Sequence, residues 1–426
     1  MRKSDFLFRS HLAFAAIVGL LCAWSSISAI PASAARAEIT YWFWKDNPDD
    51  NTIANLAAKF EKETGIHVNL MSDVTYNEFF SFLVNSIAAG TAPCAAQLNT
   101  TYLGPLINAG VLEPLNDRIA AWPGRSAVTP SLWSYVVGPD GKTQYAMPNK
   151  FLMFYLYYRK DIFKAAGVAV PKTQQEFVDA AKALAASAPG KQFAFNLRAG
   201  NGGWDQWAAF LVAGGARFID DSGKVVLNSP EALKSNQLYL STYQWAPPGT
   251  INMASGGQII QELEAGTTAM AIHHLGTAKA LKLGPDKIGV APIPSLTGDP
   301  ATSTYLGTMN MNGVFASCKN KDAAFKWVSY LTEANAQLEI AKGLDGYLPV
   351  VDSVARDPHF AGDQYFQASL QMAAHAVLAW PPIPGTTAVP AAFPPALQAA
   401  LLKKASGDSV VQAVAKALSG RNRAGR

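Results

Sequence analysis

The sequence has little cysteine, little charge and few long apolar runs. Three of its 426 residues are cysteine and 15% are charged. No spacing of Cys and His resembles a metal site, so we expect neither a bound metal nor another cofactor. Apart from the short tail at 421–426 no run of basic residues stands out, which leaves nucleic-acid binding with little support. After residue 24 no apolar run is long enough to span a membrane.

The first 37 residues have the organisation of an export signal. Arg2, Lys3 and Arg9 precede an apolar run at 12–24, and small residues follow at 32–37. A positive start, a short apolar segment and an A-x-A site are typical of a secretory signal peptide. The run is also shorter than the about 20 apolar residues of a spanning helix. We therefore expect cleavage after Ala34 or Ala37 and a protein that works outside the cytoplasm.

Two cysteines remain once this signal is removed. Cys22 lies inside the signal, and the bulky Leu21 before it argues against a lipid-modified cysteine. Cys94 and Cys318 are far apart in the sequence. An oxidising compartment would allow a disulfide between them, but buried single thiols are the commoner case and are the interpretation we favour.

The chain after the signal alternates strand and helix patterns. Strand-like segments at 39–44, 66–70 and 94–98 enclose two helical patterns. Thr75 and Glu78 have the spacing of a capping box at the start of the second helix. This βαβαβ order predicts a parallel sheet with helices on both faces.

The α/β pattern restarts in the second part of the chain. A long apolar strand is expected at 151–158, Thr173 with Glu176 caps a later helix, and the proline-rich stretch at 381–395 is predicted to be irregular. There is no internal repeat and no disordered linker. The pattern therefore favours an α/β chain of two lobes with a ligand cleft between them.

Several segments together carry a family resemblance. In order they are GTAP at 90–93, AGVLEPL at 109–115, YAMP at 145–148, LYYRKD at 156–161, AGV at 166–168, KNKDAA at 319–324 and GYLPV at 346–350. Their order and spacing resemble family 1 extracellular solute-binding proteins of ABC importers, the group that includes maltose-binding protein. The resemblance covers nearly the whole chain after the signal, and its specificity lies in the series rather than in one motif.

The resemblance implies a two-lobed periplasmic-binding-protein fold with several interlobe crossovers. By this analogy the N-terminal lobe holds 38–148 and 313–343, and the C-terminal lobe holds 149–312 and 344–426. The lobes would close about a hinge near 148–151 and 309–313. It further implies a monomer that is not an enzyme, that takes a small-molecule ligand and that hands it to the permease subunits of an ABC transporter.

Aromatic and polar residues near strand ends are the candidates for ligand contact, because an aromatic plane covers the C–H face of a sugar and polar groups bind its hydroxyl rim. Trp204 and Trp207 follow Asn201-Gly202-Gly203 at a helix start, where family members place an aromatic residue in the cleft. Core packing is the alternative for both. If they do contact ligand, replacement by Ala should weaken binding with little loss of fold.

Further candidates follow other predicted strands. Those after the first three strands are Trp44, Asp46, Tyr76, Asn99 and Thr100. His274 ends an apolar strand and could donate to ligand oxygens, titrate near neutral pH or be structural. Similarity to family members adds Gly307 and Tyr347, and the position of Trp380 before the proline-rich stretch makes it a further candidate.

A neutral carbohydrate or polyol is the favoured ligand. The runner-up is glycerol-3-phosphate or a glycerophosphodiester, whose binders resemble this chain at Trp204-Asp205-Gln206-Trp207. Those binders also need a carboxylate near Thr100, a hydroxyl near Phe151 and an arginine near Pro390, which are missing here, and a buried phosphate without a charged partner is unfavourable.

Two other classes have less support. A secreted glycoside hydrolase needs a pair of carboxylates across the scissile bond, and nothing in the pattern points to such a pair. An iron carrier could use Tyr157 and Tyr158, but alternation along their apolar strand separates these two side chains.

Overall fold

The structure is a computed structural model that describes residues 37–220, 222–254, 256–299, 302–344, 347–380 and 383–420. The expected export signal lies outside the described residues, so its cleavage stays a prediction. No helix in the described ranges combines the length and apolar character needed to cross a membrane.

The first part of the chain forms the βαβαβ unit that the sequence predicts. Its elements are β1 (Glu38–Trp42), α1 (Thr52–Thr64), β2 (His67–Met71), α2 (Tyr76–Ala88), β3 (Ala95–Asn99) and α3 (Thr100–Asn108). Strands β2 and β3 both pair with β1 in parallel. The apolar face of α1 is buried, and Gly65 ends this helix at a φ of 72°, a conformation that glycine adopts without strain.

The two predicted capping boxes have different outcomes. At α6 (Gln174–Ser187) the Thr173 side chain accepts from Glu176 N while Glu176 accepts from the backbone of Thr173, so this box is formed. At α2 the Thr75 hydroxyl donates to the Glu78 carboxylate at 2.8 Å and makes no bond to the helix backbone. The helix still begins where predicted, and its residues Phe79 and Leu83 are buried in the core.

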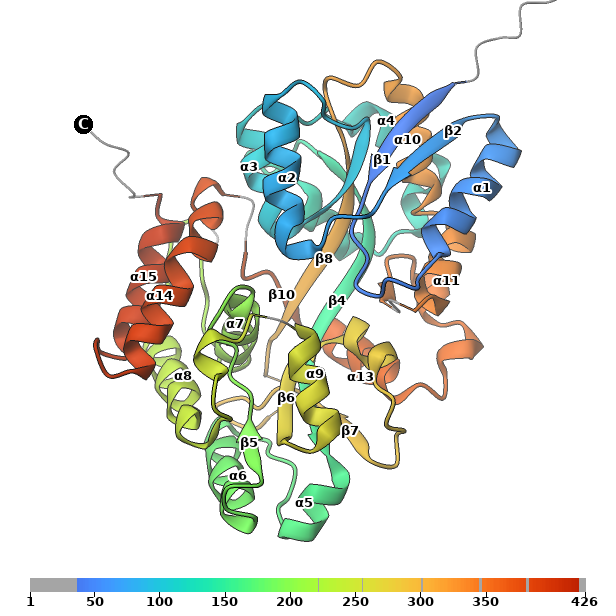
Figure 1. The fold of residues 1–426 in the computed structure, drawn as a ribbon. Coiled ribbons are helices and arrows are strands. Elements are labelled where there is room, and N and C mark those ends of the chain that lie inside the picture. The colour runs from blue at the N-terminus through green and yellow to red at the C-terminus, as the bar shows by residue number, and fades with distance from the viewer. Residues whose placement is uncertain are drawn as a thin grey trace, which may run out of the picture. The chain divides into compact units, whose positions relative to one another are not determined.

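Two long strands link the parts of the sheet. β4 (Ala146–Arg159) and β8 (Tyr305–Val314) pair antiparallel and lie side by side in Figure 1. The strand order is β2-β1-β3-β8-β4-β6-β5, with β6 (Thr268–His274) and β5 (Phe193–Phe195) parallel to each other. The register of β4 against β8 shifts between Pro148 and Lys150.

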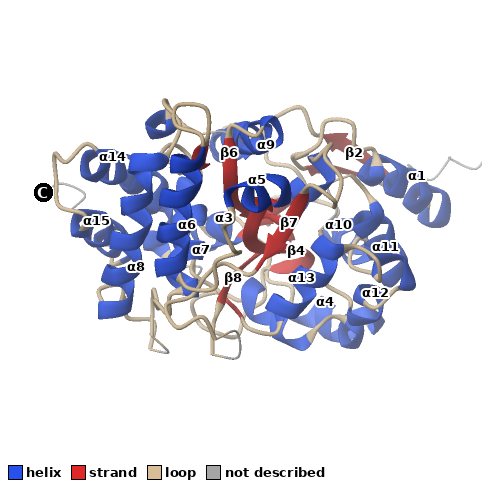
Figure 2. Cartoon of the chain, turned by 90° about the horizontal axis from the view of Figure 1, so that it is seen from below, coloured by secondary structure: helices blue, strands red, loops and turns tan. Residues whose placement is uncertain are grey.

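Helices cover both sides of these strands (Figure 2). Those of the middle of the chain are α5 (Lys160–Ala166), α7 (Gly203–Ala213), α8 (Pro230–Ser241) and α9 (Gly256–Ala265), with strand β7 (Ile288–Ala291) after them. Those of the last part are α10 (Lys321–Tyr330), α11 (Ala334–Lys342), α12 (Asp352–Ala355), α13 (Gln364–Ala373), α14 (Val389–Leu401) and α15 (Asp408–Leu418).

The predicted irregular stretch at 381–395 is wrong from residue 389 onward. Helix α14 begins at Val389 and contains Pro394 and Pro395. Its residues Val389, Phe393, Leu397 and Leu401 recur every four positions and are buried. The stabilisation from burying this stripe against α7 and α15 outweighs the loss of the backbone hydrogen bonds that the prolines cannot donate.

The expectation of two buried free thiols is also wrong. Cys94, just before β3, and Cys318, in the turn after β8, form a disulfide with their Cα atoms 4.6 Å apart. The backbone already brings the two together, because Phe315 N donates to Cys94 O at 2.9 Å. β8 pairs with β3, so residues 224 positions apart become neighbours, which sequence spacing alone cannot indicate.

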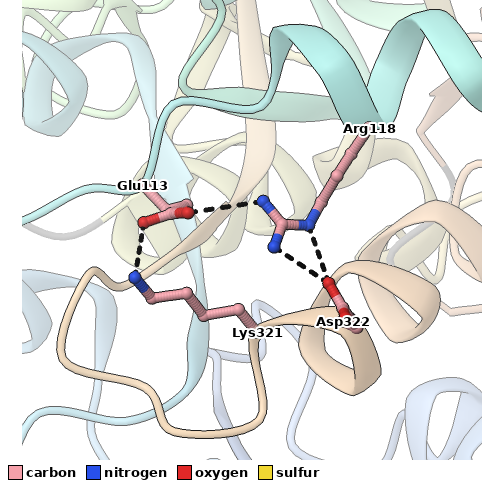
Figure 3. A network of polar contacts seen from close by, with 4 residues as sticks. All are labelled: Glu113, Arg118, Lys321 and Asp322. Carbon is pink, nitrogen blue, oxygen red and sulfur yellow. Dashed lines mark hydrogen bonds and ion pairs between the residues drawn. The ribbon is translucent and has the colours of Figure 1, made fainter.

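A polar network ties the start of α10 to α4 (Asn116–Ala121), as Figure 3 shows. Arg118 lies within 3.3 Å of Glu113 and within 2.9 Å of Asp322, and Lys321 lies 2.8 Å from Glu113. A segment after β8 thus packs with the first part of the chain. This agrees with the expected return of the chain to the N-terminal lobe at 313–343. The boundaries of the two lobes stay a prediction.

Candidate functional site

A cavity of about 760 Å³ lies where several strand ends and helix starts converge. Its walls come from segments after β1, β2 and β3, from β4 and β8, from the loop between β5 and α7, and from α9 and the end of β6. This volume falls within the range of small-molecule sites. Polar side chains from separate strands therefore meet around one space, as the α/β pattern predicts.

Aromatic residues line the wall that follows β1, β2 and β3. The Trp44 ring lies 5.5 Å from Tyr76, 5.2 Å from Phe79 and 6.1 Å from Tyr102, measured between ring centroids. Trp44 and Tyr76 both border the cavity, but Trp44 is only 2% exposed. Tyr76 is the more accessible of the two, so it is better placed to contact a ligand.

Asn99 connects this wall to the helix behind it. Its Oδ1 accepts from Tyr102 N at 2.9 Å and thereby caps α3, while its Nδ2 donates to the Tyr76 hydroxyl at 3.2 Å. Asn99 and Thr100 border the cavity together with Asp46. One residue therefore begins the helix and orients the tyrosine at the cavity wall.

A second part of the lining carries Arg198 and Asp205, which the sequence analysis did not select as site residues. Arg198 follows β5 and donates to Ala254 O through its guanidinium, and its Nε has no partner among the described residues. Burial lowers the pKa of Arg198, an effect that the nearby Asp205 opposes. Arg198 could have been found by the rule that selected Asn99, because it lies shortly after the end of strand β5.

Asp205 lies in the first turn of α7. Its Oδ1 accepts a hydrogen bond of 2.6 Å from Trp380 Nε1. Burial raises the pKa of the Asp205 carboxyl to about 6, although Trp380 and Arg198 both act in the opposite direction. The cavity therefore holds a carboxylate that has lost much of its hydration.

Gln206 holds this wall together. Its Oε1 accepts from Arg198 N and from the Tyr239 hydroxyl, both at 2.7 Å. Its Nε2 donates to Asn196 O at 3.1 Å and Ile272 O at 3.3 Å. The loop that carries Arg198 is thus fixed both to α7 and to strand β6.

His273 and His274 end β6 at the cavity, with ring centroids 4.3 Å apart. Burial, together with the charge of Arg198, lowers the pKa of His274 to about 3 and holds the pKa of His273 well below its usual value. Both shifts favour the neutral rings, so we favour hydrogen bonding or a structural role for His274 over titration near neutral pH. His274 Nδ1 has no partner among the described residues.

Five predicted site residues do not border the cavity. Trp207 is fully buried, donates to Asn236 at 3.0 Å and packs on Phe393. Trp204 is 5% exposed. Trp380 is also buried and reaches the site through Asp205. For these three residues the position favours core packing or support of a neighbour over direct contact with a ligand.

Gly307 and Tyr347 also lie behind the cavity wall. A Cβ added at Gly307 would meet Phe151, so this glycine is packed against β4. Tyr347 is 1% exposed, its ring lies 6.0 Å from His274, and the Lys150 ammonium lies 5.1 Å from its centroid. Ligand contact by all five residues stays a prediction. The described residues contain no group of side chains that could hold a metal ion.

Comparisons with known proteins agree with this architecture. The family model described as bacterial extracellular solute-binding protein matches residues 55–368. A relative from Brucella abortus (strain 2308), named only as a binding protein, is 27% identical over 421 residues, which cover 93% of this chain and 96% of the relative.

Two solved structures share the fold at low sequence identity. An ABC transporter solute-binding protein from Thermotoga lettingae TMO, bound with α-D-tagatose, has a TM-score of 0.78 at 23% identity and covers 90% of this chain and 99% of its own. One from Agrobacterium radiobacter K84, in complex with ribitol, has a TM-score of 0.76 at 23% identity over 90% and 98% of the two chains.

These matches confirm the two-lobed α/β fold and the resemblance predicted from the sequence. The family model alone spans most of the described chain. The chain belongs to the bacterial extracellular solute-binding proteins.

Proposed function

We propose that this protein captures a neutral carbohydrate or polyol outside the cytoplasm and delivers it to the permease of an ABC importer. The observation that carries the proposal is the cavity, in which planar polar groups and aromatic rings from separate strand ends face one space. Asn99, Arg198 and Asp205 supply acceptors and donors for hydroxyl groups, and Tyr76 supplies an aromatic ring. This combination suits a ligand with an apolar face and a rim of hydroxyls.

The charges around the cavity favour a neutral ligand. Its lining includes three basic residues, Lys45, Arg198 and Lys282, and three acidic residues, Asp46, Asp205 and Glu264. The two signs balance, so the lining has no surplus charge to neutralise a phosphate or an ammonium group. Solute-binding proteins of the same fold are in complex with α-D-tagatose and with ribitol, which are both neutral.

One observation supports the glycerophosphate runner-up. The arginine that this ligand class needs is missing near Pro390, but the guanidinium of Arg198 borders the cavity. It could donate to a phosphate in the way that charged groups bind phosphate elsewhere. Asp205 nearby opposes this, because it would repel the same phosphate.

A thermal-shift panel tests the proposal. The purified protein is heated with ribitol, D-tagatose, maltose and sn-glycerol 3-phosphate, each at several concentrations. A ligand at about 100 times its Kd stabilises the folded state by about 2.7 kcal/mol, so a neutral binder should raise the Tm by several degrees. A rise with glycerol phosphate and none with the neutral compounds would favour the runner-up. No rise with any of the four would contradict carbohydrate capture.

Delivery of the ligand requires a conformational change of the binding protein that a permease can recognise. We propose that the chain crosses between the lobes along β4 and β8 and that the lobes close on the ligand about these strands, near the register shift between Pro148 and Lys150. The protein acts as an exported monomer and not as an enzyme, after removal of the signal at 1–37. Arrival outside the cytoplasm is also consistent with the Cys94–Cys318 disulfide.

A further inference from the structure

We propose that the Asn201-Gly202 pair beside the cavity is a site of spontaneous deamidation, and that its isoaspartate product distorts the cavity wall. Asn201 is exposed, and the next residue, Gly202, borders the cavity. The sequence contains one other Asn-Gly pair, Asn312-Gly313. This chemistry is independent of the ligand that the cavity takes, and it therefore goes beyond the proposed function.

The reaction needs only the two residues and water. The backbone nitrogen of Gly202 attacks Cγ of Asn201, and its proton is transferred through water to the side-chain amide, which leaves as ammonia. Water then opens the five-membered imide at either of its two carbonyls, which gives aspartate or isoaspartate. Glycine favours the attack, because it has no Cβ to hinder the approach of its nitrogen. Both products add a negative charge, and isoaspartate also adds one carbon atom to the backbone.

The local turn presents the pair at the surface. Gly203 N donates to Gly200 O at 3.1 Å. This bond closes a four-residue turn with Asn201 and Gly202 at its centre. Gly202 has a φ of 77° and a ψ of 0°, the values of the third residue of a type II turn. The nitrogen of Gly202 is not the donor that closes the turn, so its attack on Asn201 does not require this bond to break.

The second Asn-Gly pair has the same chemistry in a protected place. Asn312 and Gly313 lie in β8, where Gly313 is paired with both β3 and β4. Asn312 is fully buried, and its Oδ1 accepts from the Tyr41 hydroxyl at 2.7 Å. A backbone held on both sides cannot bring its nitrogen to the neighbouring Cγ, and burial limits the access of water. In the folded protein the reaction should therefore occur at 201–202 and not at 312–313.

The segment after Asn201 has no room for an extra backbone atom. A Cβ added at Gly202 would clash with the guanidinium of Arg198, and one added at Gly203 would clash with Arg198 O. Helix α7 begins at Gly203 and contributes Asp205 to the cavity lining. Because the packing is this close, the additional carbon of isoaspartate must displace Arg198 or the start of α7. Either displacement changes the cavity wall.

Peptide mapping of the purified exported protein tests the reaction, after incubation at pH 8.5 and 37 °C in native buffer and in guanidinium chloride. After reduction, trypsin releases residues 199–217, whose single asparagine is Asn201, and residues 288–319, which contain Asn312. Mass spectrometry locates and measures the amide-to-acid conversion in each peptide. In guanidinium chloride both pairs should convert at similar rates. In native buffer Asn201 should convert about tenfold faster than Asn312 or more, because reaction at Asn312 requires the core to open.

Variants test the effect on the fold. Asn201→Gln keeps an amide and should abolish conversion at this position, because the larger ring that it would have to form closes far more slowly. Asn201→Asp carries the charge of the product without the extra backbone carbon, so it is the matched control. Acidic protein is isolated from the aged sample by ion exchange. Its isoaspartate fraction should unfold at a Tm a few degrees below that of fresh Asn201→Asp.

Each result bears on one part of the proposal. If the 199–217 peptide keeps its amide in native buffer but loses it in guanidinium chloride, the deamidation site is overturned. Equal conversion of both peptides in native buffer would also overturn it, because the reaction would then proceed through unfolding. If isoaspartate protein and Asn201→Asp unfold at the same Tm, the turn has room for the extra carbon and the distortion of the cavity wall is overturned. None of these results decides whether the protein captures a carbohydrate, so the two proposals fail separately.

Discussion

The ionised carboxylate of Asp205 lowers the stability of the folded protein and supplies an acceptor for ligand binding. Its carboxylate is held beside Trp380 and Arg198 in a partly dehydrated site, and its pKa is raised to about 6 by burial. A group whose pKa is higher in the folded than in the unfolded protein favours folding in its protonated form. Its contribution is therefore favourable below about pH 4 and is lost as the pH rises through 6.

Asp205→Asn should make the ligand-free protein more stable at pH 7.5 while it weakens binding. A pKa rise of about two units corresponds to on the order of 2–3 kcal/mol of destabilisation by the ionised carboxylate. Urea unfolding at pH 7.5 and pH 4 measures this, and the gain should shrink at the lower pH. If the D205N protein is less stable than wild type at pH 7.5, the carboxylate is stabilised by its neighbours and the prediction is wrong.

Affinity for a neutral ligand should fall as the pH drops from 7.5 to 5. A hydroxyl that donates to Asp205 prefers the ionised form, so protonation near a pKa of about 6 removes its acceptor. The other groups facing Asp205 do not titrate in this window, because Arg198 stays charged and burial raises the pKa of Tyr76 and Tyr102. His273 and His274 stay neutral, because the pKa of each is lowered. Calorimetry across this range should show an affinity that depends on pH in the wild-type protein and does not depend on pH in D205N. A pH dependence that D205N retains would come from another titratable group.

Trp207 illustrates a residue whose role depends on tertiary structure. The ring is fully buried between Phe218 and Phe393, and its Nε1 donates to Asn236. Trp207→Ala should therefore lower the free energy of unfolding by about 3–5 kcal/mol. Denaturant unfolding measures the loss, with Asp322→Asn as a surface control near zero. If the Trp207→Ala protein has normal stability but no longer binds ligand, the result would contradict core packing and favour contact between Trp207 and the ligand.

At the scale of elements, the sequence predicted more of the scaffold than of the site. Helices α1 and α6 and the βαβαβ order follow from apolar spacing and cap residues, which are local signals. The pairing of β8 with β3 and β4 is not local, and it decides that Cys94 meets Cys318. Likewise, strand-end positions identified Tyr76 and Asn99, whereas only the packing of α7 distinguishes Asp205, at the cavity, from Trp207, in the core.

The disulfide should stabilise the link between β3 and the turn after β8. Reduction with dithiothreitol, or the double variant C94A/C318A, should lower the free energy of unfolding by about 2–4 kcal/mol. The exported protein should contain no titratable thiol after denaturation, since Cys22 leaves with the signal. The double variant should be insensitive to dithiothreitol. Two free thiols in exported protein, or an unchanged Tm on reduction, would contradict the pairing.

At the scale of the whole molecule, two apolar clusters share the long strands. One contains the core around β1, β3 and α10, and the other contains α6, α7, α8, α14 and α15. Along β4, Met153 and Tyr155 belong to the first cluster, while Phe154 and Leu156 belong to the second. Strands β4 and β8 therefore contribute buried residues to both clusters.

Small-angle X-ray scattering with and without ligand tests the central claim, capture of a neutral polyhydroxylated solute by closure around the cavity. The measurement uses the neutral compound that raises the Tm most, at a concentration that calorimetry shows to be saturating. The account predicts a smaller radius of gyration for the loaded protein, and an unchanged radius for D205N at the same ligand concentration, if that concentration lies below its weakened Kd. Identical scattering curves for free and loaded wild-type protein, with binding confirmed in the same sample, would contradict it.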